Sequence, residues 1–494
     1  MVGVDYRRGM MKKIPMLING EWIYGDAEAL LDVGNPSTGK VIAQISNASQ
    51  AQVEEAVRAA RIAFESDEWR QWKAYERGQL LIDFAHYIRQ HAEEWSLLEC
   101  RDVGKPLTQA RADIEAAARY FEFYGGAADK VMGDTIPIED GLLNAVVLEP
   151  VGITVHIVPW NYPIQITARS VAAAIATGNA VIVKSAEDTP FTTHAITEWF
   201  AEKLPKGIFQ HITGLGRDVG PYLTTHPDIN HITFTGSVPT GIAVMKAAAE
   251  NVVPVTLELG GKSPNIVFAD ANMELALEGV VRAIIQNAGQ TCSAGARLLI
   301  EETIKDTFLP QLVQKFQAIQ VGPGEADMDM GPLLNERQHT KITTLLRQAK
   351  KDGYVITGGE PLTIEGYENG FYVQPTILDG VPPNDPLAQE EIFGPVLTVL
   401  TFSSVEEAIT LANGTDYGLV AGVWSQNIDT AHYVASRVQA GQVFVNNYGA
   451  AGGIQMPFGG YKKSGIGREK GFVALRNYTQ MKNIAIRYAP PIQH

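Results

Sequence analysis

The sequence predicts an α/β protein with a doubly wound parallel sheet, a second α/β domain and a small β element. Three observations predict this fold. Between residues 151 and 259, five short apolar runs alternate with four helical stretches, a pattern typical of a parallel sheet covered by helices. A second series of apolar runs and helices begins after Gly260. Two further segments, 134–148 and 478–488, have strand character but belong to neither series.

Composition limits the class of protein and of partner. A chain of 494 residues is too long for one hydrophobic core. A formal charge of −15 and a pI near 5.2 argue against nucleic acid or an anionic membrane as a partner. No apolar run reaches the roughly 18 residues of a membrane span. Two cysteines cannot form a disulfide framework, which indicates a reducing compartment. We therefore expect a cytoplasmic protein with no membrane and no nucleic-acid partner.

The N-terminal part predicts short strands followed by helices. Strand-like runs between residues 17 and 46 are broken by Asn-Gly and Pro-Ser-Thr-Gly turns. Ser49 to Gln52 forms an N-capping pattern that begins a helix extending through Glu65. Helical periodicity then continues over residues 74–132, with an interruption near Asp102–Pro106.

The first α/β series places its strands at residues 153–158, 180–183, 209–212, 231–234 and 255–259. Helices are predicted between them at residues 167–176, 192–204, 218–226 and 240–250. In such a sheet, ligands bind at the carboxyl ends of the strands. We assign residues 1–128 and 150–259 to this domain.

The second domain is assigned to residues 260–475. Its predicted elements are helices at 273–287 and from Ser404, and strands near 297–300, 372–377, 396–402, 419–424 and 442–446. Residues 129–149 and 476–494 form the small β element. Strands left outside a core often pair across a subunit boundary, so we expect a homodimer or homotetramer.

Three side chains carry the chemistry. Cys292 lies in Asn287-Ala-Gly-Gln-Thr-Cys292, Glu258 ends an apolar strand, and Asn161 stands between two prolines in Pro159–Pro163. A thiol, a carboxylate and an amide are the groups needed to attack a carbonyl, hydrolyse a thioester and hold an oxyanion. The other cysteine, Cys100, follows a helical pattern and is expected to pack as a small hydrophobe.

Seven motifs in order resemble the aldehyde dehydrogenase superfamily, over residues 17–488. They are Pro159-Trp-Asn-Tyr-Pro163, Val183-Lys-Ser-Ala-Glu187, Phe234-Thr-Gly-Ser-Val238, Leu257-Glu-Leu-Gly-Gly-Lys-Ser-Pro264, Gly289-Gln-Thr-Cys292, Glu390-Glu-Ile-Phe-Gly-Pro-Val396 and Pro457-Phe-Gly-Gly-Tyr-Lys462. Each is weak or moderate alone, but their common order and spacing make a chance match improbable.

The resemblance implies a mechanism without a metal. The Cys292 thiolate would add to an aldehyde, and the Asn161 amide and the backbone N–H of Cys292 would hold the oxyanion. One such donor is typically worth about 10²–10³ in rate. Hydride would leave for a nicotinamide, and Glu258 would activate water to release the carboxylic acid.

The resemblance also implies a dinucleotide site. Gly214 to Gly220 is one residue too long for a G-x-G-x-x-G fingerprint, and the family uses Gly236 and Ser237 before a helix N-terminus. By resemblance the other cofactor-binding residues are Trp160, Lys184, Glu187, Leu259, Glu391 and Phe393. Because Glu187 would place a carboxylate at the adenosine ribose, we expect NAD, with NADP possible.

The substrate pocket is implied less sharply, at Tyr162, Ile166, Arg169, Gln286, Thr291, Ser293 and Gly452. Small residues at 449–453 stand where relatives often carry an aromatic, which favours a medium-to-bulky apolar aldehyde. The alternative is a semialdehyde dehydrogenase for a carboxylate-bearing substrate or an aminoaldehyde. Arg169 matches one arginine of the semialdehyde enzymes, but Gln286 replaces the second. A structural ion pair at Arg169 is therefore favoured.

Three rival functions remain open at this point. A CoA-acylating dehydrogenase would not need Glu258 as a water-activating base. A cysteine hydrolase would leave the dinucleotide features unexplained, and none of the ten histidines shares a motif with Cys292. A structural or binding protein on the same fold would not need all three of Cys292, Glu258 and Asn161.

Overall fold

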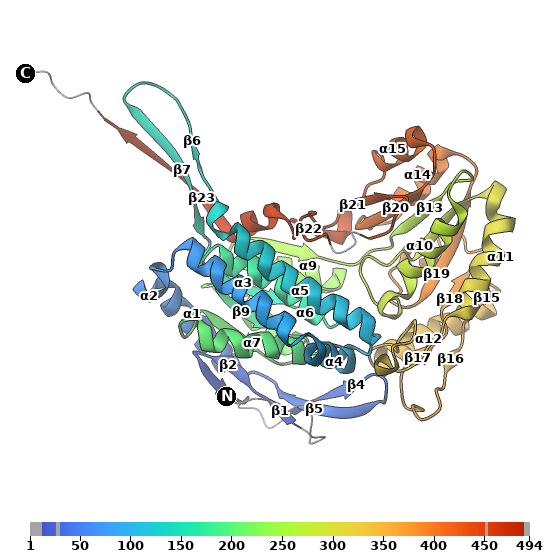
Figure 1. Cartoon of the computed structure of the whole chain (residues 1–494), viewed down its shortest axis with the longest axis horizontal. Coiled ribbons are helices and arrows are strands. Elements are labelled where there is room, and N and C mark those ends of the chain that lie inside the picture. Colours follow the sequence, from blue (N-terminus) through green and yellow to red (C-terminus); the bar gives the residue numbers. More distant parts are fainter. Residues whose placement is uncertain (1–11, 26–29, 450–452, 489–494) are drawn as a thin grey trace, which may run out of the picture.

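The structure is a computed structural model that describes residues 12–25, 30–449 and 453–488. Two α/β bodies lie side by side, and a thin β arm projects from the first of them (Figure 1). Within the described ranges, no helix is both long and apolar enough to cross a membrane.

The first body is built on an eight-stranded sheet whose central five strands are parallel. These are β8 (Ile153–Ile157), β9 (Ala180–Lys184), β10 (Phe209–Ile212), β11 (His231–Thr235) and β12 (Val255–Glu258). The full strand order is β22-β12-β11-β8-β9-β10-β2-β3, so the winding reverses between β8 and β11. Three flanking strands each pair antiparallel with their inner neighbour: β2 (Met16–Ile18) with β10, β3 (Glu21–Ile23) with β2, and β22 (Gly465–Ile466) with β12. The doubly wound sheet predicted from the sequence is confirmed, each strand to within one residue.

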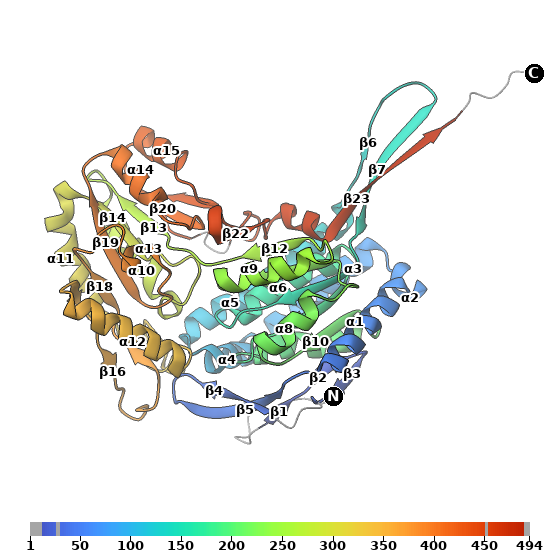
Figure 2. The ribbon, with the colours of Figure 1, turned by 180° about the vertical axis from the view of Figure 1, so that it is seen from behind.

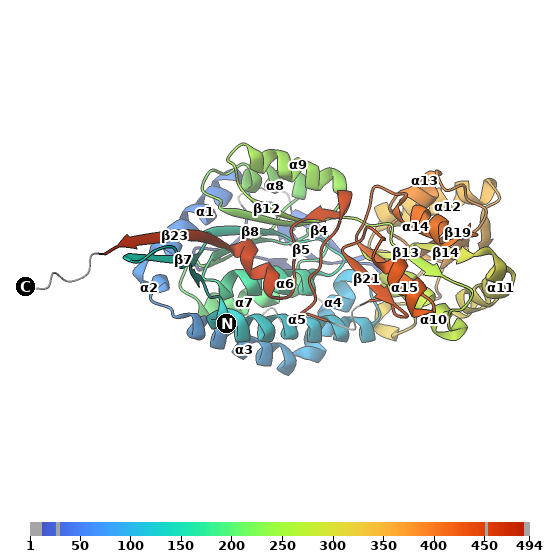
Figure 3. The ribbon, with the colours of Figure 1, turned by 90° about the horizontal axis from the view of Figure 1, so that it is seen from above.

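Helices cover both faces of this sheet, as seen from above in Figure 3. One face carries α1 (Gln50–Glu65), α8 (Gly216–Thr224) and α9 (Val238–Ala249). The other face carries α3 (Ala74–Gln90), α4 (Ala92–Val103), α5 (Leu107–Ala127), α6 (Pro163–Ala176) and α7 (Phe191–Lys203). The short α2 (Asp67–Arg70) follows α1. The capping box predicted at Ser49 is present, with Gln52 N–H donating to Ser49 Oγ.

The central strands are fully buried because helices cover both faces of the sheet. Every residue of β9, β10 and β11 is buried. Cys100 is 1% exposed on α4, as expected for a small core residue, and burial raises the pKa of its thiol to about 12.

The second body has a seven-stranded sheet in the order β15-β18-β19-β14-β13-β20-β21, parallel except for β15. Its strands are β13 (Pro264–Val267), β14 (Arg297–Glu301), β15 (Val355–Thr357), β18 (Thr376–Leu378), β19 (Val396–Phe402), β20 (Val420–Trp424) and β21 (Gln442–Val445). Its helices are α10 (Met273–Ile285), α11 (Glu302–Ala318), α12 (Glu336–Lys351), α13 (Pro386–Gln389), α14 (Val405–Asn413) and α15 (Ile428–Ala435). Figure 2 shows this body from behind.

One predicted strand of this body is wrong. Residues 372–377 form two strands, β17 (Tyr372–Val373) and β18, because Gln374 and Pro375 interrupt them. Proline cannot donate to a ladder, so the chain changes partner there. β17 pairs with β16 (Pro361–Leu362) instead of entering the main sheet. The sequence analysis also missed β13, β15, β16, α11, α12, α13 and α15.

The two unassigned segments form the arm together. β7 (Leu142–Pro150) pairs antiparallel with β23 (Thr479–Arg487) on one side and with β6 (Asp134–Thr135) on the other. A separate small sheet joins β1 (Lys12–Ile14), β5 (Lys40–Ser46) and β4 (Leu30–Asn35).

Candidate active site

The candidate site lies where the winding of the first sheet reverses, at the carboxyl ends of β8, β11 and β12. A cavity of about 650 Å³, part of it open to solvent, is lined there by residues of both bodies. They are Pro159, Trp160, Asn161, Thr235, Gly236, Ser237, Glu258, Gly260, Cys292, Gln338, Lys341, Glu391 and Phe393. The structure thus brings the predicted thiol, carboxylate and amide to one cavity.

The Asn161 side chain is held in one orientation. Its Nδ2 donates to the carbonyl of Gln290 at 3.0 Å, two residues before the thiol. An amide carries two N–H donors, so the second remains for a ligand in the cavity. Asn161 is 4% exposed, which keeps water from competing strongly for that donor.

The turn that leads to Cys292 contains backbone conformations that are unfavourable for non-glycine residues. Asn287 and Ala288 have φ of 49° and 53°, and Gly289 continues at 71°. Left-handed non-glycine residues persist only where surrounding contacts impose them. Here Asn287 N–H donates to Gln109 Oε1 at 2.9 Å and Asn287 Nδ2 to the Asn161 carbonyl at 3.0 Å. These bonds fix the thiol-bearing loop against the amide-bearing loop.

The surroundings of Cys292 are apolar. The half-buried thiol packs with Phe444 and Tyr448 against Leu419, Val420 and Phe458. Burial raises the pKa of the Cys292 thiol to about 12, while the Arg169 guanidinium acts in the opposite direction. The thiol is therefore protonated at neutral pH, and its activation requires a base.

Glu258 is the carboxylate that lines the same cavity as Cys292. It ends β12 and is 1% exposed, and its oxygens have no hydrogen-bond partner within the described part of the chain. Burial raises the pKa of Glu258 well above its ordinary value, and the nearby Glu469 carboxylate raises it further. A base with a raised pKa accepts protons more readily near neutral pH.

Arg169 does not contribute to the cavity wall. Its Nε contacts Glu469 Oε2 in a buried ion pair, and its guanidinium lies 5.4 Å from the Phe458 ring centroid. The structural ion pair favoured in the sequence analysis is present. The assignment of Arg169 to a substrate pocket is not supported, because the guanidinium is already neutralised.

The residues predicted for the cofactor fall into two groups. Gly236, Ser237, Glu391, Phe393 and Trp160 line the cavity. Gly236 and Ser237 lead into α9, whose N-terminal amides suit a phosphate. Glu391 Oε1 accepts from Gly261 N–H at 3.1 Å, and the Trp160 and Phe393 rings meet edge to face at 5.2 Å.

The second group lies outside the cavity wall. Lys184 Nζ pairs with Glu187 Oε2 at 3.0 Å. Burial raises the pKa of Glu187 and Lys184 lowers it, and the net shift is downward. Leu259 is buried, and a Cβ on Gly241 would come within 2.5 Å of its side chain. The Leu259 side chain therefore packs closely against the first turn of α9.

The residues predicted for the substrate pocket are less clearly gathered. Tyr162 and Ile166 lie at the start of α6, and Thr291 and Ser293 flank Cys292, but none of them lines the cavity. Gln286 is exposed at the end of α10. Gly452 lies outside the described residues.

Sequence reasoning missed Gln338 and Lys341. They stand three residues apart on one face of α12 and line the cavity, and the buried Gln338 Oε1 has no partner among the described residues. Polar residues at helical spacing are ordinary, so nothing in the sequence singled them out. Across the described ranges there is also no group of three or more His, Cys, Asp or Glu that could hold a metal ion.

Comparison with known proteins places the chain in a family. The sequence profile of the aldehyde dehydrogenase family matches residues 22–484. A betaine aldehyde dehydrogenase of Bacillus subtilis (strain 168) is 40% identical over 474 residues, covering 95% of this chain and 96% of that protein. A hydroxyisobutyraldehyde dehydrogenase of Mycolicibacterium austroafricanum is 39% identical over 478 residues, covering 96% and 94%.

Solved structures agree with this placement. An NAD⁺ complex of an aldehyde dehydrogenase from Bacillus cereus superposes with a TM-score of 0.93 at 40% identity, covering 96% of each chain. A betaine aldehyde dehydrogenase from Staphylococcus aureus in complex with NAD⁺ gives a TM-score of 0.94 at 37% identity, covering 97% of this chain and 95% of that chain. The chain therefore belongs to the aldehyde dehydrogenase family.

Proposed function

We propose that this protein oxidises an aldehyde to its carboxylic acid with NAD, through a covalent adduct on Cys292 that water hydrolyses. One observation carries the proposal: Cys292, Glu258 and Asn161 line the same cavity as Gly236 and Ser237 at the start of α9. A nucleophile, a base and an oxyanion donor are thus placed beside a site suited to a dinucleotide.

The residues present fit NAD. The N-terminal amides of α9 would hold the pyrophosphate, Glu391 a ribose, and Lys184 with Glu187 the adenosine ribose. NAD supplies the hydride acceptor when it is bound. The cofactors in the two solved relatives support this choice.

The first step forms a bond between Cys292 Sγ and the aldehyde carbon. Because burial raises the thiol pKa to about 12, the thiol must lose its proton as this bond forms, and that proton passes to solvent water in the open part of the cavity. The developing oxyanion would accept hydrogen bonds from the free N–H of the Asn161 amide and from the backbone N–H of Cys292. Loss of one such donor typically costs about 10²–10³ in rate. Departure of hydride from the thiohemiacetal leaves a thioester on Cys292.

The second step hydrolyses that thioester. Glu258 would take a proton from water as its oxygen attacks the acyl carbon, and it would return that proton to the leaving Cys292 sulfur, which releases the carboxylic acid and the free thiol. A CoA-acylating enzyme would use a second thiol in place of water, and it would not need a buried carboxylate at this position.

We propose a medium-to-bulky apolar aldehyde as the substrate. Cys292 packs against an apolar cluster of Leu419, Val420, Phe444, Tyr448 and Phe458, which lies beside the cavity without lining it. Each substrate methylene buried there would contribute about 0.8 kcal/mol. Arg169 is committed to Glu469 and is not free to bind a substrate carboxylate. The small residues at 449–453 in the sequence also favour a bulky aldehyde. Residues 450–452 lie outside the described structure.

Rapid mixing tests the mechanism. Cys292→Ala should abolish NADH formation, while Glu258→Gln should give a burst of NADH followed by slow turnover. Cys100→Ala is the matched control, because it removes a buried thiol that does not line the cavity, and it should keep the wild-type rates. Normal turnover by Cys292→Ala would contradict the proposed mechanism.

A substrate panel tests the specificity. It should contain acetaldehyde, hexanal, benzaldehyde, betaine aldehyde and succinic semialdehyde, each at saturating NAD. We expect kcat/KM to be highest for hexanal or benzaldehyde, and Phe458→Ala to reduce it for these two more than for acetaldehyde. A highest kcat/KM for succinic semialdehyde or betaine aldehyde would favour the charged-substrate alternative.

A further inference from the structure

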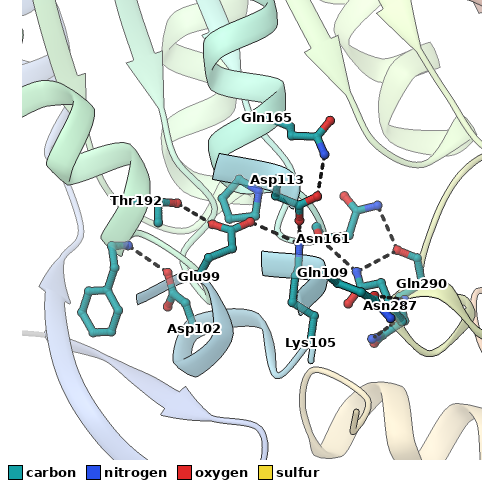
Figure 4. A network of polar contacts seen from close by, with 12 residues as sticks. Glu99, Asp102, Lys105, Gln109, Asp113, Asn161, Gln165, Thr192, Asn287 and Gln290 are labelled. Carbon is teal, nitrogen blue, oxygen red and sulfur yellow. Dashed lines mark hydrogen bonds and ion pairs between the residues drawn. The ribbon is translucent and has the colours of Figure 1, made fainter. Parts of the chain in front are cut away.

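A buried ionic cluster stands behind the Asn161 loop. Lys105 lies between α4 and α5, and its side chain is fully buried. Its ammonium contacts Glu99 of α4 at 3.2 Å and Asp113 of α5, and it donates to the Asn161 carbonyl at 3.1 Å. Figure 4 shows Lys105 pointing between the two carboxylates toward Asn161.

The local sequence directs Lys105 inward. Gly104 caps α4 with φ of 88°, and a Cβ there would lie 2.8 Å from Pro332 and 2.9 Å from Pro36. Pro106 is the N-cap residue of α5. A left-handed glycine before Lys105 and a fixed φ after it leave the turn little freedom. This turn is the helix interruption seen in the sequence.

Each group in the cluster has a partner. An ammonium has three N–H donors, and Glu99, Asp113 and Asn161 account for all of them. The second oxygen of Glu99 accepts from Thr192 at 2.7 Å, and that of Asp113 accepts from Gln165 at 2.5 Å. The cluster therefore joins α4, α5, α6 and α7 at the amide-bearing loop.

The cluster contacts two successive residues of the loop that carries Asn161. The Asn161 carbonyl accepts from Lys105 and from Asn287, so both its lone pairs are used. The Lys105 ammonium also lies 4.2 Å from the ring centroid of Tyr162, the next residue. Lys105 thus holds Asn161 by a charged hydrogen bond and Tyr162 by a cation–π contact. Because both residues are held, rotation of the backbone at Asn161, which carries the proposed oxyanion donor, is limited.

We propose that Lys105 is a positioning residue for the oxyanion donor: by fixing the peptide of Asn161, its ammonium sets the direction of the Asn161 side-chain amide. This inference rests on the proposed function, since it concerns the amide that would hold the substrate oxyanion. Lys105 itself lines no part of the cavity and touches no reacting atom.

The competing interpretation is that the cluster only ties four helices together. The two roles differ in their dependence on Asn161. A residue that acts through the Asn161 amide has no further effect once that amide is removed. A residue that only supports the fold affects the rate equally with or without the amide.

The variant must avoid leaving buried charges unpaired. Lys105→Met alone would leave two carboxylates without a cation, and it could fail to fold. The combined change Glu99→Gln, Lys105→Met and Asp113→Asn removes all three charges and keeps similar volumes, and the new amides at positions 99 and 113 keep acceptor oxygens. Asp102→Ala is the matched control, because Asp102 is also a buried carboxylate of α4 but binds Phe191 N–H, away from Asn161.

The experiment is a double-mutant cycle on the NADH burst rate, measured by rapid mixing with hexanal and saturating NAD. We expect the combined variant to lower the burst rate at least ~10-fold with KM and NAD affinity nearly unchanged, since a small misplacement of a catalytic donor costs up to about 10² in rate. In an Asn161→Ala background, the same combined change should have almost no further effect. Asp102→Ala should leave the burst rate unchanged.

The outcomes separate the two proposals. An equal loss of burst rate in both backgrounds, or a wild-type burst rate in a folded combined variant, overturns the positioning role. Absence of any aldehyde-dependent NADH formation by the wild-type protein with every aldehyde tested overturns the proposed function instead.

Discussion

Arg169 and Glu469 form a buried ion pair whose two charges act in opposite directions on Glu258. The Glu469 carboxylate raises the pKa of Glu258 and the Arg169 guanidinium lowers it, in addition to the upward shift that burial causes. The two partners come from α6 and from the segment after β22. The basicity of the proposed catalytic carboxylate is therefore set by groups outside the cavity wall.

Changing either partner should shift the acid limb of the pH profile. Glu258 must be deprotonated to act as a base, so activity is lost as pH falls through its raised pKa. Glu469→Gln removes the charge that raises this pKa, and the limb should move to lower pH. Arg169→Gln removes the charge that lowers it, and the limb should move to higher pH.

The measurement is kcat against pH with hexanal, because kcat reports the ionisations of the bound enzyme. Glu325→Gln breaks an exposed ion pair with Arg101 and should leave the profile unchanged. Shifts of Glu469→Gln and Arg169→Gln in the same direction would contradict this electrostatic account.

Glu187 should select NAD over NADP. Its carboxylate pairs with Lys184 and would repel a 2′-phosphate at the adenosine ribose. Glu187→Gln leaves Lys184 without its carboxylate, so kcat/KM for NADP should rise by about tenfold and that for NAD should fall, as expected for about 1.4 kcal/mol of charge interaction. Glu202→Gln, an exposed change near the C-terminal end of α7, serves as the control. A wild-type protein that prefers NADP would refute the assignment.

The projecting β arm should assemble subunits. β23 is the edge strand of its sheet, and its outward side chains include the exposed Met481, Ile484 and Ile486. A long apolar edge normally pairs with another chain. We expect at least a homodimer by light scattering at micromolar concentration, and Ile484→Asp should shift it toward monomer. Lys246→Asp, on the exposed side of α9, should not. A monomeric wild-type mass would rule out the assignment of this arm.

Gly289 should be required for the shape of the Cys292 loop. It has φ of 71°, and a Cβ there would lie 2.1 Å from the Gly394 carbonyl oxygen. Gly289→Ala should therefore lower the NADH burst at least ~100-fold, the scale of losing an oxyanion donor. Gly353 is the matched control, since it has φ of 80° but open space around it. Gly353→Ala should cost about 1 kcal/mol of stability and keep the burst. Similar burst rates in both variants would show that the loop tolerates the change.

Buried neutral histidines should weaken the fold in acid. Burial lowers the pKa of His156 to about 3, with the nearby His231 adding to the shift, whereas an unfolded histidine has its ordinary pKa near 6.5. Between these values the unfolded chain binds a proton that the native chain does not, so the free energy of unfolding falls as pH falls. The slope is at most about 1.4 kcal/mol per pH unit for each histidine.

The test compares denaturant unfolding of the wild type and His156→Gln from pH 7 to pH 4. The variant should lose less stability over this range, because its side chain does not titrate. His91→Gln is the control, as His91 is partly exposed at the end of α3. Parallel stability curves for the wild type and His156→Gln would contradict the expectation.

Local sequence patterns predicted most of the strands and helices of the first body. The five parallel strands and their helices follow from apolar runs and caps that lie within a few residues of one another, as at Ser49 and β9. The prediction failed at residues 372–377 because the partner of each half strand is set by distant segments, β16 and β19. α12 was missed although Ile342, Leu346 and Ala349 recur at helical spacing along its buried face.

By itself the sequence determined the family and the doubly wound fold, and it indicated Cys292, Glu258 and Asn161 as candidate catalytic residues, since these inferences rest on motifs that are contiguous in the chain. Only the tertiary structure decided that Arg169 is neutralised by Glu469, that Lys105 holds the Asn161 carbonyl, and that Gln338 faces the cavity. Each of these contacts joins residues far apart in sequence. Arginine, lysine and glutamine side chains are common in any sequence, so their residue types alone do not indicate their partners. Packing excludes water from these side chains and leaves each charge or amide with one available partner.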